Sequence, residues 1–287
     1  GTRRIYTRTG DDISHSFPDV LAAMDFDGTL DGELLVRADD GESVAPFNAL
    51  QQRLNRKTVT KRQMETHPAF IRAYDLLHDG TDDLRSLTFR DRRGALEGFV
   101  ARHGSPRLDL SPLVPVTTLA ELDALRMNPP APEIEGLMLK RWNSVYVAGR
   151  PAGQWYKWKR DPYLVDAVLL YAQRGHGRRS GFYSDFTFGV WKDDILTPVG
   201  KAYFGFTDDE LKQLDKFVRD NTIERFGPVR SVTPALVLEV AFEGLQRSAR
   251  HKSGIAMRFP RINRIRWDKP AAEADRLATL EALLAGP

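Results

Sequence analysis

Two short stretches of the sequence place charged side chains inside apolar runs that predict buried strands. In EGLMLK, residues 135–140, Glu135 and Lys140 bracket three apolar residues. In WYKWK, residues 155–159, Lys157 and Lys159 lie two apart and therefore share one face of an extended strand. Because an unpartnered buried charge is unfavourable, these strands should face other charged groups. A carboxylate beside two ammonium groups suits a phosphate together with a divalent metal ion.

The first half of the chain mixes the predicted strands and helices that must position these residues. Leu30 to Val36 predicts a strand with Asp31 and Glu33 on one face, where two carboxylates could bind a metal ion or accept hydrogen bonds from sugar hydroxyls. Residues 46–57 predict an amphipathic helix with Arg53 among the basic residues of its polar side. Residues 70–100 predict a strand, a turn at Asp79-Gly80 and a helix from about Phe89.

After Asp161-Pro162 the pattern becomes one of alternating strands. The first three are predicted over residues 163–175, 181–191 and 196–206, and more strands follow, including residues 236–245. A helix over about 208–220 should begin with a capping box made by Thr207 and Glu210. Five or so strands with one helix between them favour an OB-fold, a small barrel that commonly binds nucleic acid.

Length and composition fit two soluble domains. The 287 residues are 41% hydrophobic and 28% charged, values that are ordinary for a globular protein. The sequence has no cysteine, which excludes disulfides and thiolate metal sites, and no apolar run approaches the roughly 18 residues of a membrane span. We therefore expect a cytoplasmic protein without a membrane partner.

Positive charge is concentrated in the second half of the chain. Residues 1–149 carry 19 basic and 22 acidic side chains, whereas residues 150–287 carry 23 and 17. Much of the excess lies in residues 247–269, where eight basic side chains face one acid, Asp268. Aromatic and apolar residues are interleaved with these charges, which favours a surface for polyphosphate or nucleic acid over a merely solvated face.

Five segments resemble, in order, the motifs of the covalent nucleotidyltransferases, the family of ATP-dependent DNA ligases, RNA ligases and mRNA capping enzymes. LDGE at 30–33 is similar to motif III, YDLL at 74–77 to motif IIIa, EGLMLK to motif IV and WYKWK to motif V. RFPRINRIRWDK at 258–269 closely resembles motif VI in the form typical of ATP-dependent DNA ligases. The resemblance implies an α+β fold: an adenylation (nucleotidyltransferase) domain, residues 1–161, followed by an OB-fold β-barrel domain, residues 162–287.

The resemblance also implies a monomeric, nucleoid-associated bacterial enzyme that seals nicked duplex DNA with ATP, by way of AMP, and Mg²⁺. Glu135 and Glu33 would hold the metal ion, and Glu33 would contact the ribose. The expected nucleotide-contacting and catalytic side chains are an arginine after the lysine motif, an aromatic ring that stacks on adenine, the motif V lysines and the motif VI arginines: Arg8, Tyr74, Lys157, Lys159, Arg258 and Arg261. The expected DNA contacts are basic: Arg53, Arg178, Arg179, Arg264, Arg266 and Lys269.

One motif of the family is absent from the sequence. Its nucleophilic lysine belongs to a KxDGxR segment, and no KxDG occurs in these 287 residues; the nearest match, residues 25–28, begins with Asp25. A carboxylate cannot form the lysyl phosphoramidate, so we expect a fragment that is not adenylated by ATP, although its parent protein would be. Closure of an already adenylated nick does not need that lysine. Two alternatives stay open: an RNA ligase or capping-type enzyme, and a non-catalytic OB-fold fragment that binds nucleic acid.

Overall fold

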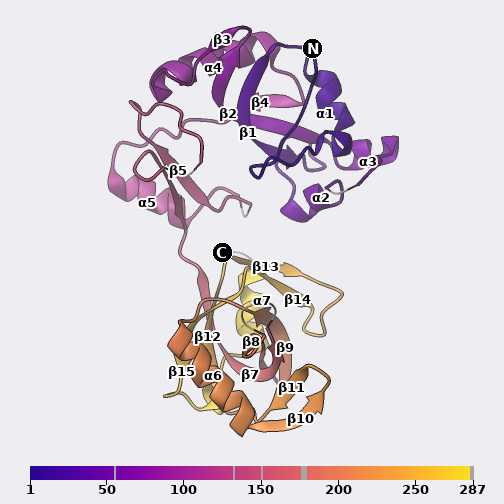
Figure 1. The fold of residues 1–287 in the computed structure, drawn as a ribbon, viewed down its shortest axis with the longest axis vertical. Helices are drawn as coiled ribbons and strands as arrows, with labels where there is room; N and C mark the ends of the chain where they lie inside the picture. Colours follow the sequence, from indigo (N-terminus) through magenta and orange to yellow (C-terminus); the bar gives the residue numbers. More distant parts are fainter. Residues whose placement is uncertain (55, 132, 150, 176–179, 285–287) are drawn as a thin grey trace. The chain divides into compact units, whose positions relative to one another are not determined.

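The computed structural model describes residues 1–54, 56–131, 133–149, 151–175 and 180–284. The chain divides into two compact units, Gly1–Arg160 and Asp161–Pro287 (Figure 1). Each has hydrophobic clusters of its own. The sequence predicts a division one residue later, between Asp161 and Pro162. No helix of the described part is long and apolar enough to span a lipid bilayer.

The first unit is built on a four-stranded sheet and a long helix. The elements are β1 (Gly28–Val36), β2 (Ala69–Asp79), β3 (Asp82–Asp83), β4 (Leu108–Leu110) and α4 (Phe89–His103). Strand β2 pairs antiparallel with β1 and β3 and parallel with β4. Helix α4 begins after Thr88, whose hydroxyl accepts a hydrogen bond from the Asp91 amide, and buries Leu96 and Phe99 against Leu76 of β2. The strand, turn and helix predicted over residues 70–100 are confirmed.

Short helices surround the buried side chain of Arg53. They are η1 (Ser14–Ser16), α1 (Pro18–Ala23), α2 (Phe47–Gln51) and α3 (Lys61–Thr66). The prediction of one helix over residues 46–57 is wrong, because α2 ends at Gln51. The chain leaves the helical path where Arg53 turns inward: its guanidinium pairs with Asp19 and donates to the Ser16 carbonyl at 2.9 Å.

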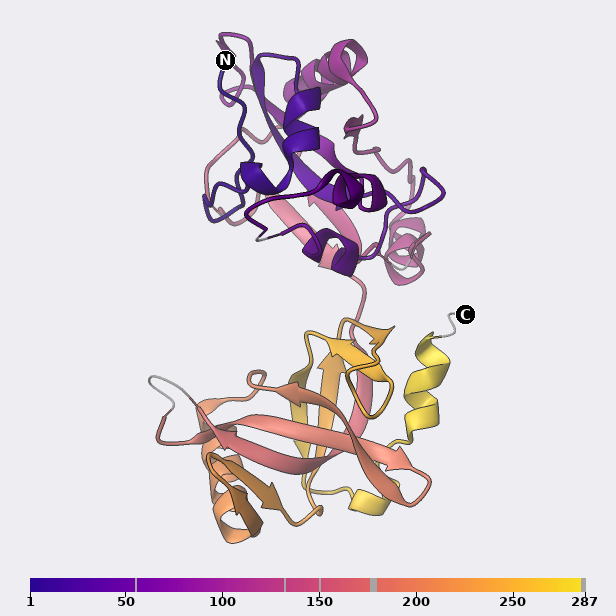
Figure 2. The same cartoon turned by 90° about the vertical axis from the view of Figure 1, so that its right-hand side faces the viewer.

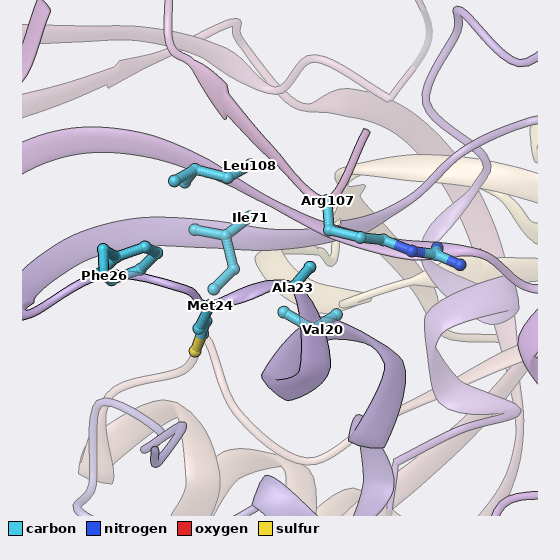
Figure 3. Close-up of a pocket in the computed structure, with 7 residues that line it drawn as sticks. All are labelled: Val20, Ala23, Met24, Phe26, Ile71, Arg107 and Leu108. Atoms are coloured by element: carbon cyan, nitrogen blue, oxygen red, sulfur yellow. The ribbon is translucent and has the colours of Figure 1, made fainter. Parts of the chain in front are cut away.

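A small apolar cavity lies between α1 and the strands β2 and β4. It is lined by residues of α1, of the chain that follows it and of the β2–β4 region: Val20, Ala23, Met24, Phe26, Ile71, Arg107 and Leu108 (Figure 3). The Arg107 side chain extends away from the apolar group, and its guanidinium lies 3.3 Å from Asp19. None of the side chains predicted to do chemistry lines this cavity.

The two charged stretches singled out by the sequence form a ribbon of their own. Strands β5 (Gly136–Lys140) and β6 (Trp155–Lys159) pair antiparallel as a two-stranded sheet, next to α5 (Leu119–Met127). The prediction that they are buried strands is wrong, since Met138 and Tyr156 are 52% and 50% exposed. A two-stranded ribbon lacks the flanking strands that would bury it, so its charged face stays open to solvent.

The second unit is built on a strongly curved antiparallel sheet (Figure 2). Its larger hydrophobic cluster includes Leu169 and Phe188, and a smaller one includes Val168 and Val237. The pairing order of the sheet is β10-β11-β7-β12-β15, and β8 joins β7 to β9. The strands are β7 (Tyr163–Arg174), β8 (Tyr183–Lys192), β9 (Ile195–Ala202), β10 (Thr222–Phe226), β11 (Val229–Val232), β12 (Val237–Phe242) and β15 (Arg261–Arg266). A hairpin of β13 (Gly244–Arg247) and β14 (Ile255–Arg258) precedes β15.

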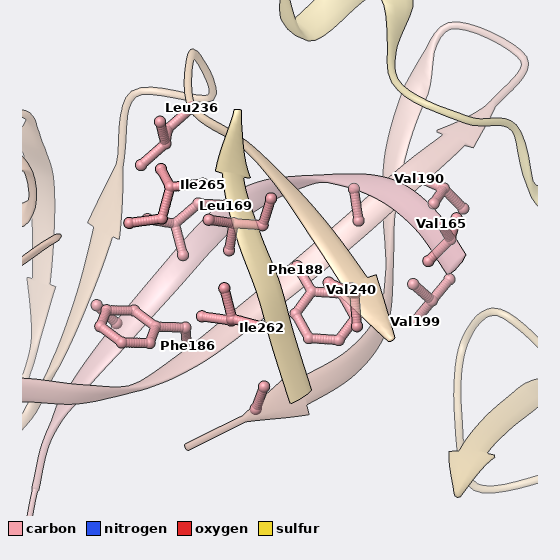
Figure 4. Packing of buried hydrophobic residues seen from close by; sticks show 14 of the residues in the cluster. Val165, Leu169, Phe186, Phe188, Val190, Val199, Leu236, Val240, Ile262 and Ile265 are labelled. Atoms are coloured by element: carbon pink, nitrogen blue, oxygen red, sulfur yellow. The ribbon is translucent and has the colours of Figure 1, made fainter. Parts of the chain in front are cut away.

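The core of the second unit is filled by residues that alternate along its strands. Leu169, Phe186, Phe188, Val240 and Ile262 converge from four strands and are at most 1% exposed (Figure 4). Helix α6 (Asp208–Asp220) begins with the predicted Thr207–Glu210 capping box, and α7 (Leu277–Leu284) follows a 3-10 turn, η3 (Ala271–Glu273).

Candidate active site

One carboxylate binds both lysines of β6. Glu135 Oε2 lies 3.1 Å from Lys157 Nζ and 3.1 Å from Lys159 Nζ. Both ammonium groups lie on one face of β6, as the two-residue spacing predicts. The charged partner that the sequence predicts for them is Glu135. We call these three residues the carboxylate clamp. Its side chains are 30% exposed for Glu135, 54% for Lys157 and 35% for Lys159, so a phosphate in solution could reach them.

Gly136 makes the close approach of the two strands possible. It pairs with Lys159 across the ribbon and has a φ of +147°, a backbone conformation that side-chain-bearing residues rarely adopt. A Cβ atom here would lie 2.6 Å from the Lys159 Cα. Any larger residue would push β6 away, and the lysine ammonium groups would move away from Glu135 with it.

The two lysines of the carboxylate clamp stabilise the ionised form of Glu135. Burial alone would raise the pKa of Glu135, but the hydrogen bonds and positive charges of Lys157 and Lys159 outweigh it and lower this pKa to about 2. Glu135 therefore stays ionised near neutral pH. Because both lysines share one carboxylate, the clamp carries a net positive charge and can attract an anion.

Glu33 supplies a second carboxylate from β1. Although this residue is exposed, desolvation of its carboxylate raises its pKa, and the negative charge of Glu135 raises the pKa further. The charges of Lys157 and Arg8 act in the opposite direction. The predicted residues Glu33, Arg8 and the clamp therefore share one electrostatic environment.

Lys140 lies among aromatic rings, a position in the site that the sequence pattern does not predict. Its Nζ is 4.2 Å from the ring centroid of Tyr74, 4.8 Å from that of Phe89 and 3.7 Å from that of Trp155. Burial lowers the pKa of Lys140 to about 8, although Asp75 and Asp31 oppose the shift. The only sequence signal is a lysine at the end of an apolar strand. Tyr74, the predicted adenine platform, thus already has a cation over its ring.

The connection between β5 and β6 is fixed to the sheet by buried polar contacts. Arg92 of α4 makes two hydrogen bonds to Asp75 of β2, at 2.8 and 2.9 Å, and both side chains are 0% exposed. Arg92 also donates to the Ser144 carbonyl at 3.2 Å, and Tyr146 donates to Asp31 at 2.8 Å. Residues 144–146 are therefore held against β1 and α4, which fixes the ribbon on the sheet that carries Glu33 and Tyr74.

The basic residues of the last predicted motif lie in the second unit, and most of them are paired there. Arg258 ends β14 with its guanidinium 5.7 Å from the Phe259 ring, and Arg261 pairs with Glu243 at 2.9 Å. Asp166 of β7 binds both Arg266 and Lys269, at 3.2 and 2.8 Å. Arg264 is exposed. Its exposure makes it the most accessible of the predicted DNA contacts in this motif.

Arg53 does not belong to a DNA-binding surface, which corrects the prediction from its helical position. Its side chain is 0% exposed, and its donors are taken by Asp19, the Ser16 carbonyl and the His67 carbonyl. Because α2 ends before Arg53, the residue is not on the polar face of a helix. Arg178 and Arg179 lie outside the described residues.

The residues present fit a divalent cation only if its ligands are shared with a phosphate. In the part of the chain that the structure describes, no group of three or more His, Asp or Glu side chains could hold a metal ion. Glu33 and Glu135 supply two carboxylates, and the charge of one raises the pKa of the other, a repulsion that a cation would relieve. Mg²⁺ commonly binds through one or two carboxylates with phosphate oxygens and water as its other ligands.

Comparison with known proteins identifies the family to which this chain is similar. Residues 1–159 match the family model described as ATP dependent DNA ligase domain, and residues 179–269 match ATP dependent DNA ligase C terminal region. A probable DNA ligase of Koribacter versatilis is 36% identical, with 98% of this chain and 52% of that protein aligned. One of Kineococcus radiotolerans is 38% identical, with 98% and 54% aligned. The chain thus spans about half the length of these relatives.

The fold is also similar to that of solved ligases. A structure described in a structure–function analysis of Lig E DNA ligases superposes with a TM-score of 0.61 at 18% identity, covering 92% of this chain and 86% of that one. This likeness confirms the predicted α+β fold class, a nucleotidyltransferase domain followed by an OB-fold domain.

Proposed function

This chain belongs to the ATP-dependent DNA ligase family, and from that membership we propose that it carries the strand-joining chemistry of a DNA ligase. The proposed substrate is a nick in duplex DNA whose 5′-phosphate carries AMP, and the proposed acting form is a monomer. The observation that supports this most strongly is the carboxylate clamp, in which two lysines and a glutamate converge on an open ribbon.

The joining step forms one phosphodiester bond and breaks one anhydride bond. The oxygen of the nick's 3′-hydroxyl attacks the 5′-phosphorus, AMP departs with the electron pair of the broken bond, and the hydroxyl proton passes to solvent. Such transfers depend on positioning and charge neutralisation more than on covalent help from the protein. Lys157 and Lys159 supply that neutralisation by turning from Glu135 to the phosphate oxygens as negative charge develops on them.

The neighbouring side chains of the first unit position the nucleotide. Tyr74 is the candidate for stacking on adenine, and Glu33 can accept hydrogen bonds from the ribose hydroxyls. Arg8 contributes positive charge from the turn before η1. In the second unit Arg258 and Arg261 are the candidates for contacting the phosphates of a nucleotide.

Magnesium is proposed as a partner of Glu33 and Glu135. When bound, Mg²⁺ would neutralise charge on the phosphate oxygens and so assist both departure of the leaving group and approach of the 3′-hydroxyl. The chain's own contribution is to keep Glu135 ionised, with its low pKa, and to hold it beside the lysines. The first step of ligation, lysine adenylation by ATP, needs a lysine motif that these 287 residues do not contain.

The test is sealing of a nicked DNA duplex that already carries AMP on its 5′-phosphate, with Mg²⁺ and without ATP. We expect the chain to convert this substrate to continuous DNA and not to become labelled when incubated with radioactive ATP. Lys212→Met serves as a control variant, because that lysine is 66% exposed and lies outside the clamp. Sealing confined to the corresponding RNA nick, or no sealing with intact nick binding, would contradict the proposal.

A further inference from the structure

An exposed run of positive charge follows α2 and continues into the first turn of α3. Residues 56–62 have the sequence RKTVTKR, which contains no acidic residue. All four of its basic side chains are exposed: Arg56, Lys57, Lys61 and Arg62. We call residues 56–62 the basic connector. It lies next to Arg53 in the sequence, but unlike Arg53 its basic residues face solvent.

The charge of the basic connector is poorly compensated within the protein. Lys61 lies 3.9 Å from Glu65, but their side chains are 88% and 63% exposed, and an ion pair of this kind contributes little. Arg56 donates to the Gln52 carbonyl, which carries no net charge. Lys57 and Arg62 have no ion pair with any residue that the structure describes. Four like charges within seven residues repel one another and concentrate anions around them.

The basic connector is nevertheless held in place, and the residues that hold it are not the charged ones. Arg53 contacts both Ser16 and the His67 carbonyl, so it ties the chain before the connector to the chain after α3. The Ser16 hydroxyl donates to the Arg56 carbonyl at 3.1 Å, and Thr60 forms a capping box with Gln63. The exposed cations are therefore displayed from a fixed backbone, which reduces the entropic cost of binding a partner.

We propose that the basic connector binds phosphates of the duplex DNA backbone. The inference rests on the proposed function and extends it to a surface that contains none of the residues assigned to catalysis. Lysine and arginine supply donors for phosphate oxygens, and residues 56–62 include no aromatic ring on which a base could stack. Contacts to phosphates carry no sequence information, so they hold the protein on the duplex without reading its bases.

The experiment measures how the affinity of the chain for a nicked duplex falls as salt rises from about 50 to 200 mM. The test variant replaces Arg56, Lys57, Lys61 and Arg62 by glutamine. Each lost phosphate contact should reduce the slope of log K against log salt by about 0.9, so we expect a decrease of roughly 2 to 4 units. The charge-conserving variant Arg56→Lys, Arg62→Lys should keep the slope of the unchanged chain.

Two further measurements separate binding from folding and from chemistry. The midpoint of urea unfolding should be unchanged, because Arg53, Thr60 and Ser16 are untouched. Two half variants, Arg56→Gln with Lys57→Gln and Lys61→Gln with Arg62→Gln, should each show about half of the decrease in slope that the fourfold variant shows. The maximal rate of sealing a pre-adenylated nick at saturating protein should also be unchanged. An unaltered slope in a chain that binds and seals nicks would overturn the role of the connector and leave the ligase proposal standing. If the unchanged chain neither binds nor seals nicks, both proposals fail.

Discussion

Two acidic residues of the first unit, Glu135 and Asp75, meet their basic partners in different surroundings. Glu135 meets two lysines through one oxygen, and all three side chains are partly exposed. Asp75 meets Arg92 through both oxygens, and both side chains are 0% exposed. Water can reach the first group and replace its partners, whereas nothing in the interior can replace the partners of the second. The lysines bound to partly exposed Glu135 can therefore exchange it for a phosphate, whereas the buried pair of Asp75 and Arg92 can only stabilise the fold.

The largest effect is expected at the buried pair. Replacing Arg92 by leucine leaves the Asp75 carboxylate buried without its cationic partner and with the Leu76 amide still donating to it at 3.0 Å. Breaking such a buried pair costs about 3–5 kcal/mol. Urea unfolding of the Arg92→Leu chain should show this loss. A control that removes an exposed arginine of the same unit, Arg85→Gln, should change the free energy of unfolding by less than about 1 kcal/mol. Equal losses in the two variants would remove the contrast between buried and exposed pairs.

A pH-dependent effect is expected at Lys140, whose pKa is lowered from 10.5 to about 8 by burial. Between these two values the unfolded chain binds a proton at this site and the folded chain does not, so stability rises with pH. The unchanged chain should therefore gain stability relative to Lys140→Met as pH increases from about 8 to about 10.5. Parallel unfolding curves for the two chains across this range would show that Lys140 is not desolvated by its aromatic neighbours.

The smallest effect is expected at the hydrogen bond between Tyr146 and Asp31. Tyr146→Phe keeps the ring and removes only the hydroxyl that donates to Asp31 at 2.8 Å. A hydrogen bond of this kind contributes about 0.5–1.5 kcal/mol, or somewhat more when its acceptor is charged. Thermal unfolding of Tyr146→Phe, with Tyr171→Phe of the second unit as the matched control, should resolve the loss. No difference between these variants would mean that this hydrogen bond does not help to hold the ribbon on the sheet.

Local patterns predicted those parts of the site that depend on spacing along one strand. Lys157 and Lys159 share a face because side chains alternate, and Glu135 meets them because β5 and β6 are neighbours in sequence. The requirement for Gly136 depends on how closely β6 approaches, which no single-strand pattern reveals. In the same way the capping box at Thr207 predicted where α6 begins, since capping is a local interaction.

The sequence predictions were wrong or incomplete where a residue contacts others that are distant in the sequence. The sequence pattern predicts Arg53 on the polar face of a helix. In the structure, Asp19, 34 residues earlier, binds its guanidinium. Lys140 donates to the Tyr74 carbonyl, 66 residues away, at 3.5 Å, and this proximity follows from the packing of the ribbon on the sheet rather than from any periodicity. The predicted burial of β5 and β6 failed because an apolar composition does not show how many neighbouring strands a strand will have.

The most direct test of the role of the carboxylate clamp is the single-turnover rate at which the Glu135→Gln chain seals a pre-adenylated nick. The rate is compared with those of the unchanged chain and of Glu133→Gln. We expect Glu135→Gln to lower the rate by about 10²–10³-fold, the loss typical of removing one group that stabilises the transition state, while the free energy of unfolding changes by less than about 1 kcal/mol. Glu133→Gln should seal at the unchanged rate. An unchanged sealing rate in Glu135→Gln, or a loss of rate matched by a loss of folded protein, would contradict the claim that the exposed carboxylate clamp serves the chemistry rather than the fold.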